Sequence, residues 1–440
     1  MPPVVAVLAT ATLGVLVLAI LAGTLTSSED AAAQRRLLGW TLAAFAVHLA
    51  LGLAIRKAGV TALAAPDASY YDETARAIVD HWTRDFPLPE LPSGKEGFFY
   101  LLAALYWLFG PSPEAGLVVN AVMAAAVVPV MADVTRRLLG GSAARFLPPL
   151  LVLLPGFLIW SSQLLREAGV LFLIAVAANC AVRLTERLAP GPLVVLAAAL
   201  AVLFTFRGNV ALLMTGGLVV GVALGKRELL SGLSIGVSTL SVVLVLVLGL
   251  GLGHAGYKIS VEADLRQVET VRSDLSQSAE SGFASEADVS TTGKALAYLP
   301  VGFTNFLLGP FPWQIRSARQ LIALPDLLVW WFLLPSLWRG LWSATRLMGR
   351  RLLTLLVPAL MTGAALGLLI GNFGTVVRER PQVVILLLPV IAHGLALRRA
   401  PHAPPATMAG AVGTNQPGPS LHGRVGLPLP AGGGQLRPTP

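Results

Sequence analysis

The chain has few of the residue types that carry redox or metal chemistry. Among its 440 residues there is one cysteine and there are six histidines. The single Cys180 lies in an apolar stretch and has no second cysteine with which to form a disulfide within the chain. No two histidines are four residues apart, the spacing of a helical metal site. We therefore expect neither a disulfide framework nor a histidine-based metal centre.

Charged residues are also scarce. They make up 12% of the chain, whereas hydrophobic residues make up 55%, and the mean hydropathy is +0.73. This composition excludes an ordinary soluble globular protein. The net charge of +9 comes from basic residues dispersed over many loops, without a patch of interleaved aromatic residues, so we expect no nucleic-acid partner. The sequence predicts an all-α polytopic membrane protein.

About eleven apolar stretches are long enough to be membrane spans, because a bilayer core needs about 20 apolar residues per helix. They lie near residues 4–24, 37–55, 116–134, 146–163, 168–184, 191–206, 210–224, 229–253, 321–338, 352–371 and 381–397. The first stretch has no basic segment before it and no convincing cleavage site after it. We therefore expect it to be a helix and not a signal peptide. The predicted spans contain few charged residues. Because transporters usually keep ionisable residues inside their spans, this argues against a transporter.

The loops between these spans carry Lys and Arg in alternation. The basic loops hold Arg35, Arg36, Arg136, Arg137, Arg145, Arg183, Arg187, Lys226, Arg227, Arg339, Arg346, Arg350, Arg351, Arg398 and Arg399. Since positive charge favours the cytoplasmic side, these loops are predicted to be inside. With eleven spans, the N-terminus is then outside and the C-terminus inside.

Two long polar loops are predicted on the outer side of a transmembrane domain that covers residues 1–400. The first covers residues 56–115 and the second covers 254–320. Residues 401–440 are rich in Pro and Gly and have almost no periodic apolar pattern, which predicts a disordered cytoplasmic tail. Both outer loops are candidate places for function.

The first outer loop has the pattern of two helices at the membrane surface. One face of the first helix carries Tyr71, Ala75, Ile78, Val79 and Trp82, and the other carries Asp72, Glu73, Arg76 and Asp80. Asp67 and Ser69 are expected just before this helix. One of them could be its N-cap, with Asp72 completing a capping box from Ser69. Alternatively, Asp67 is a working carboxylate.

The apolar run at 97–110 is predicted to be the second surface helix, because about 14 residues are too few to cross a bilayer. Counting it as a span would also place the arginine-rich loops outside.

Cations are retained at several outer turns, where they are usually rare. They are Lys95 before the second surface helix, Arg166 beside Glu167, Arg207, and Arg378 with Arg380 on either side of Glu379. Each could be a snorkelling side chain or a local ion pair. Together they favour an anionic ligand at the outer leaflet, because Arg matches phosphate with two parallel hydrogen bonds and Lys with a point charge.

A carboxylate beside a cationic phosphate site suits glycosyl transfer from a lipid-phosphate sugar. The carboxylate can accept the proton of the acceptor hydroxyl, and the cations can neutralise the departing phosphate.

At this point the layout resembles the GT-C superfamily of membrane glycosyltransferases, which contains protein O-mannosyltransferases (family 39) and aminoarabinose transferases. The resemblance covers roughly residues 60–400. It rests on Asp67 with Tyr70, on GFFYLLAALYWLFGPSPEAGLVVNAV, on LLPGFLIWSSQLLREAGVLFL and on RERPQVVILLLPVIAHGLAL.

The resemblance implies roles for several residues of this chain. Asp67 would be the catalytic base or an acid that positions the acceptor, and Glu167 a second acidic site residue. Lys95 or Arg207 would contact the lipid phosphate, although the Lys-Pro-Pro common in the superfamily is Lys95-Glu96-Gly97 here. The candidate substrate-binding residues are Tyr70, Tyr71, Asp72, Lys95, Arg166, Arg207, Arg378 and Arg380. Some relatives use a divalent cation and others none, so a metal requirement stays open.

The expected function is therefore transfer of a sugar from a polyprenyl-phosphate donor to a glycan, lipid or protein acceptor on the outer face of a bacterial plasma membrane. Membrane lipid would surround the enzyme. One alternative is a polysaccharide polymerase or ligase, for which His254 is the histidine at the second outer loop. Others are a lipid or solute transporter and a scaffold without catalytic activity.

Overall fold

The computed structural model describes residues 2–226, 234, 237 and 265–399, apart from 27–29, 58–62, 66, 93, 278–281, 284–286 and 316–317. Residues Met1–Arg399 form one compact unit, whose described elements are helices joined by loops, with one isolated bridge between Gly282 and Asn372. The predicted span at 229–253, apart from positions 234 and 237, lies outside the described residues, as do His254 and the predicted tail at 401–440.

The first helices of the chain are α1 (Pro3–Leu25), α2 (Ala31–Lys57), α3 (Asp67–Arg84), α4 (Glu96–Phe109), α5 (Pro113–Leu139), α6 (Gly141–Ala144), α7 (Leu147–Leu153) and α8 (Pro155–Ser161). They are followed by α9 (Glu167–Glu186), α10 (Pro190–Phe206), α11 (Gly208–Gly225), α14 (Leu265–Gln277) and α15 (Thr292–Leu308). The last are α16 (Leu324–Met348), α17 (Leu353–Leu369), α18 (Phe373–Glu379) and α19 (Pro381–Arg399). Short 3-10 helices cover Pro312–Gln314, Ala318–Ala323 and Gly349–Leu352.

The all-α membrane architecture is confirmed. Among the described residues, seven helices are long and apolar enough to cross a membrane, or eight if the pair Gly141–Leu153 and Pro155–Ser161, bent by 55°, is one span. Helices occupy ten of the eleven predicted ranges, but α10 is shorter than 18 residues, and α16 and α17 fall within one apolar stretch, Gln320–Leu369. The count of eleven stays a prediction.

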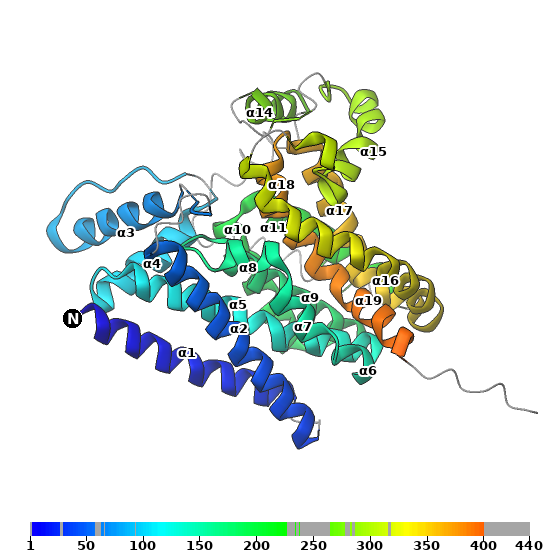
Figure 1. Cartoon of the computed structure of the whole chain (residues 1–440), viewed down its shortest axis with the longest axis horizontal. Coiled ribbons are helices and arrows are strands. Elements are labelled where there is room, and N and C mark those ends of the chain that lie inside the picture. Colours follow the sequence, from blue (N-terminus) through cyan, green and yellow to red (C-terminus); the bar gives the residue numbers. More distant parts are fainter. Residues whose placement is uncertain are drawn as a thin grey trace, which may run out of the picture. The chain divides into compact units, whose positions relative to one another are not determined.

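The centre of the compact unit is built on α5, α9 and α19, whose apolar segments are mostly buried, whereas α1 and α2 are largely exposed. Figure 1 shows α1 and α2 along one flank, with α5 behind them, α9 near the middle and α19 beside α16 on the other side. Helix α5 contacts α1, α2, α9 and α19. Its ends follow from its sequence. Pro113 occupies the first turn, Ser112 accepts a hydrogen bond from the Ala115 amide at 3.3 Å, and Gly140 ends the helix with φ +85°.

Helices α16 and α19 approach closely because small residues line their contact. A Cβ on Gly340 would lie 2.0 Å from the Val390 carbonyl oxygen, and one on Gly394 would lie 1.9 Å from the Ser336 carbonyl oxygen. Side chains at either position would push the helices apart, as in other membrane helix pairs that meet through small residues. This contact fixes α19 and therefore the end of α18, which immediately precedes it.

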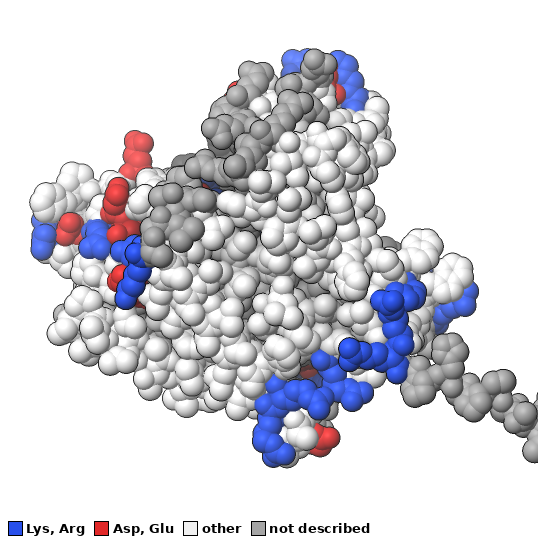
Figure 2. Space-filling model, viewed as in Figure 1, with Lys and Arg blue, Asp and Glu red and all other residues white. Residues whose placement is uncertain are grey.

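One end of the unit is rich in arginine. Figure 2 shows basic side chains gathered along the lower right edge, near α6, with acidic side chains at the left near α3 and a largely uncharged surface between them. At the basic end, Asp133 of α5 is buried and forms ion pairs with Arg136, Arg137 and Arg183. Asp133 is one of the few charged residues inside a predicted span. Its charge is compensated locally by three guanidinium groups.

The two predicted surface helices are present, with one correction. Helix α4 covers Glu96–Phe109, as expected for the 97–110 run. Helix α3, however, begins at Asp67. The predicted capping box between Ser69 and Asp72 is wrong, because both residues lie inside the helix. The Asp72 carboxylate instead accepts a hydrogen bond from Tyr106 Oη at 2.6 Å, which joins α3 to α4, and one from Arg76 Nε at 3.2 Å, within α3.

The predicted orientation can be tested by labelling cysteines introduced one at a time into a Cys180→Ala background. Tyr70 on α3 and Arg350 at the basic end are both exposed. In intact cells, we expect a membrane-impermeant maleimide to label the Tyr70→Cys variant and to label the Arg350→Cys variant after permeabilisation alone. The Cys180→Ala parent gives the background. The opposite pattern would reverse the predicted orientation.

Candidate functional site

Arg378 of α18 joins two acidic residues from distant parts of the chain. Its Nη1 lies 2.7 Å from Asp67 Oδ2, at the start of α3, and its Nε lies 2.6 Å from Glu167 Oε1, at the start of α9. The Asp67 side chain is 49% exposed, whereas that of Glu167 is 2% exposed. The two acids predicted from the sequence therefore meet at one guanidinium group, one facing solvent and the other buried.

Arg207 forms a second, deeper layer of the same site. Its Nη2 donates a hydrogen bond to Glu167 Oε1 at 3.0 Å. Its Nη1 lies 3.1 Å from Glu379 Oε1, which is close enough for an ion pair but lacks hydrogen-bonding geometry. Arg207 is almost fully buried, as is Glu167. Burying charges is costly unless they are paired, so these contacts keep the charged forms in place.

Two further cations lie beside these ion pairs. Arg166, which is 9% exposed, donates from Nη1 to the Phe206 carbonyl at 2.8 Å, and its Nε has no hydrogen-bond partner among the described residues. Burial and then the neighbouring Arg207 lower the pKa of Arg166 to about 10. The pKa of Lys95 is lowered by burial and by Arg166, while Asp67 opposes the shift. The charges of the same site therefore act on the pKa of both Arg166 and Lys95.

We call this group the Arg378 cluster. It comprises Asp67, Lys95, Arg166, Glu167, Arg207, Arg378 and Glu379. Four cations and three carboxylates leave one net positive charge in a partly buried place. The Nε atoms of Arg166 and Arg207 are buried without partners in the described part of the chain. Unsatisfied buried donors are costly, and an anion with several acceptor oxygens would satisfy them.

Hydrogen bonds between two loops hold the cluster in register. The Ala65 amide, just before α3, donates to Gln163 Oε1 at 2.7 Å. Asn120 Nδ2, from α5, donates to the carbonyl oxygens of Gln163 at 2.5 Å and Leu165 at 2.8 Å. The central helix thereby fixes the turn that carries Arg166, and this turn fixes the start of α3.

Aromatic residues of α3 and α4 pack against one another near the cluster. Tyr71 is buried, with its ring centroid 5.0 Å from that of Phe98 and 4.8 Å from that of Phe99. The pKa of its hydroxyl is raised, mainly by burial; Glu167 adds to the shift, whereas Arg166 and Arg378 oppose it. Tyr70 is exposed, with its ring edge-on to Phe99 at 5.4 Å. Tyr71 is therefore buried within range of the charges of the cluster, whereas Tyr70 is exposed beside it on α3.

Two predicted site residues lie elsewhere. Asp72 is engaged with Tyr106 and Arg76, away from Arg378. Arg380 is buried and donates from Nε to the Phe306 carbonyl at 3.0 Å, while its Nη1 lies 3.4 Å from Asp326 Oδ2. Burial lowers the pKa of Arg380 to about 10. These contacts describe a structural ion pair.

Sequence reasoning missed Asp326 as a partner. This buried acid of α16 also accepts a hydrogen bond from the Gly156 amide of α8 at 2.7 Å. A carboxylate inside a predicted span was the available signal, since charges in spans are usually paired. Glu379, the partner of Arg207, is a site residue that the sequence analysis did not predict, although it lies between Arg378 and Arg380 in the RERP turn. Across the described residues, no group of three or more His, Cys, Asp or Glu side chains is arranged to hold a metal ion.

No family model matches the sequence, and no curated protein matches it. Two crystal structures of ArnT from Cupriavidus metallidurans are similar to the chain, one bound to undecaprenyl phosphate (17% identity) and one in the apo state (18% identity). Each has a TM-score of 0.49 and covers 82% of this chain and 60% of the ArnT chain. The chain thus spans about 60% of the length of these ArnT structures. This likeness is too weak to transfer a function, so the function must rest on the residues themselves.

The buried ion pairs predict a stability effect. Replacing Glu167 with Gln leaves Arg207 and Arg378 without their shared carboxylate, and we expect the free energy of unfolding to fall by about 3 kcal/mol. The midpoint of thermal unfolding in detergent measures the change. Glu73→Gln, at an exposed acid of α3, is the matched control and should have almost no effect. Adding Arg207→Gln to Glu167→Gln should cost less than the two single changes together, because the two side chains interact directly. Strict additivity would contradict this.

Proposed function

We propose that the chain is a membrane glycosyltransferase that moves a sugar from a polyprenyl-phosphate donor to an acceptor at the membrane surface. One observation carries the proposal. Asp67 is the half-exposed carboxylate of the partly buried Arg378 cluster, which has an excess of positive charge and unpaired guanidinium donors. Such a pair of features supplies a base for the acceptor and a counter-charge for the leaving phosphate.

Asp67 is the proposed base. The acceptor hydroxyl oxygen forms a bond to the anomeric carbon of the sugar, and the bond between that carbon and the phosphate oxygen breaks. The hydroxyl proton passes to the Asp67 carboxylate, and the polyprenyl phosphate departs with the bonding electrons. Asp67 suits this role because its side chain is far more exposed than those of Glu167 and Glu379, the other acids of the cluster.

The cations are proposed to hold the donor phosphate. Arg166 and Arg207 each offer an unpaired Nε, and Lys95 adds a charge near them. Glu167 is proposed as a positioning residue, because its buried carboxylate holds Arg207 and Arg378 at fixed distances from Asp67. Tyr70, three residues after Asp67 on α3, is exposed and is proposed to offer aromatic surface to the sugar or the acceptor, whereas the buried Tyr71 is proposed to support it from below.

The proposed location of the acceptor follows from the position of Asp67. Orientation by the positive-inside rule puts the cluster on the outer face of a bacterial plasma membrane, where a glycan, a lipid or a protein could reach Asp67. This placement is part of the proposal.

The proposal predicts that Asp67→Asn abolishes transfer. A general base contributes roughly a hundredfold to ten-thousandfold in rate, so turnover should fall by that range. The measurement is transfer or donor hydrolysis by the purified full chain in lipid, with a panel of radiolabelled polyprenyl-phosphate sugars. Glu73→Gln, on the same helix, should keep the parent rate. Polyprenyl phosphate should still bind to the Asp67→Asn protein. Full activity in this variant would exclude Asp67 as the base.

The proposal also predicts that Arg166→Gln weakens binding of the donor phosphate. A hydrogen bond to a charged group is worth about 1.5–3 kcal/mol, which corresponds to roughly a tenfold to hundredfold loss of affinity. Direct binding of polyprenyl phosphate measures this without knowledge of the sugar. Arg187→Gln, at the far end of α9, is the matched control. Unchanged affinity in Arg166→Gln would remove this residue from the phosphate site.

A further inference from the structure

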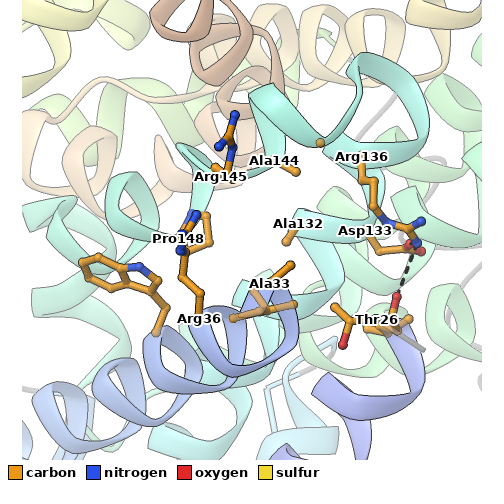
Figure 3. Close-up of a pocket in the computed structure, with 13 residues that line it drawn as sticks. Thr26, Ala33, Arg36, Ala132, Asp133, Arg136, Ala144, Arg145 and Pro148 are labelled. Carbon is orange, nitrogen blue, oxygen red and sulfur yellow. Dashed lines mark hydrogen bonds and ion pairs between the residues drawn. The ribbon is translucent and has the colours of Figure 1, made fainter. Parts of the chain in front are cut away.

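A second basic pocket lies at the arginine-rich end, away from the Arg378 cluster. It is a cavity of about 70 Å³ between the end of α1, the start of α2, the end of α5 and the segment from α6 to α7. In Figure 3 the labelled side chains surround an open space, with Arg36 and Arg145 on one side and Arg136 with Asp133 on the other. Three of the lining residues are arginines and one is an acid.

The positive charge of this pocket is not neutralised by its acid. Asp133 is already shared by Arg136, Arg137 and Arg183, so its charge is compensated by these three guanidinium groups. Arg36 and Arg145 are exposed, and neither contacts a carboxylate in the part of the chain that the structure describes. The exposed Asp30 near the rim caps α2, since its Oδ1 accepts a hydrogen bond from the Ala33 amide at 2.6 Å. The guanidinium groups of Arg36 and Arg145 are therefore available to bind an anion.

The walls of the pocket are apolar. Leu37 and Trp40 of α2 line it together with alanine and proline side chains, and the neighbouring α1 is an apolar helix that exposes most of its surface. In a chain of this kind, such a surface faces lipid tails, and a tryptophan between apolar and charged groups marks the level of the head groups. A site with charged residues at one end and apolar walls matches a lipid better than a soluble anion.

The size of the cavity also fits this occupant. A single water molecule needs only about 10–15 Å³ of such space, so the cavity accepts a group several times larger, such as a phosphate. The rest of a lipid would lie outside the cavity, along α1 and α2.

We propose that this pocket binds the phosphate headgroup of an anionic membrane phospholipid, held by Arg36 and Arg145. Arg136 would border the headgroup while it stays tied to Asp133. The occupant differs from the proposed donor in place, because it binds at the opposite, arginine-rich end of the helices. The proposal does not depend on the function of the Arg378 cluster.

The test compares lipid binding by native mass spectrometry of the purified full chain, with phosphatidylglycerol and phosphatidylcholine as probes. We expect the parent protein to prefer phosphatidylglycerol, and the double variant Arg36→Gln/Arg145→Gln to lose at least about tenfold of this preference. The control Arg35→Gln/Arg398→Gln removes two exposed arginines from the same end without touching the pocket and should keep it. Equal losses in the two double variants would overturn the proposal, because the preference would then reflect general surface charge.

A filling variant gives a second reading that keeps every arginine. Ala144→Leu places a larger side chain on the wall of the cavity and should weaken phosphatidylglycerol binding by a similar factor. Unchanged binding would show that the lipid lies outside the cavity and would contradict the site. Inorganic phosphate is the third arm. If it competes as well as the lipid does, the site takes a free anion and the assignment to a lipid headgroup is wrong.

Discussion

The contact on which the candidate site depends is the bridge that Arg378 makes between Asp67 and Glu167. Arg378 is 311 positions from Asp67 and 211 positions from Glu167 in the chain. A carboxylate as buried as Glu167 is stable in its charged form only with close cationic partners. The position of the start of α9 therefore depends on the ion pairs of Glu167 with Arg378 and Arg207. Asp67 is then held at the end of the same guanidinium group, where it meets solvent.

The two ends of the helices use the same residue types with different balances. At the arginine-rich end, the buried Asp133 has three guanidinium partners, and none of these four side chains has a buried polar atom without a partner among the described residues. In the Arg378 cluster, by contrast, donors of Arg166 and Arg207 are left over inside the protein. A closed network stabilises the packing of α5 against α9, whereas leftover buried donors are a cost that a ligand can remove. This difference separates a structural charge cluster from a candidate binding site.

Arg378 and Arg380 show how finely the fold assigns roles. They are two residues apart, yet Arg378 contacts Asp67 and Glu167, while Arg380 contacts Asp326 and the carbonyl of Phe306. The chain passes from α18 to α19 between them, so their side chains leave the backbone on different sides. The buried Asp326 of α16 pairs with Arg380, at the start of α19, and accepts a hydrogen bond from the Gly156 amide of α8. These contacts hold the three helices together. Arg378 is thereby presented from a rigid support.

The sequence by itself determined the helical membrane architecture, because the length and composition of apolar runs are local properties. It also pointed to Asp67, Glu167, Arg166, Arg207 and Arg378 as candidate residues, because cations and acids at apolar helix ends are rare enough to notice. Only the tertiary structure decided which of them meet. Asp72 and Arg380 looked equivalent to the others, but helix ends and crossings turned them toward Tyr106 and Asp326. Contacts between residues hundreds of positions apart depend on how the helices pack, which no local pattern encodes.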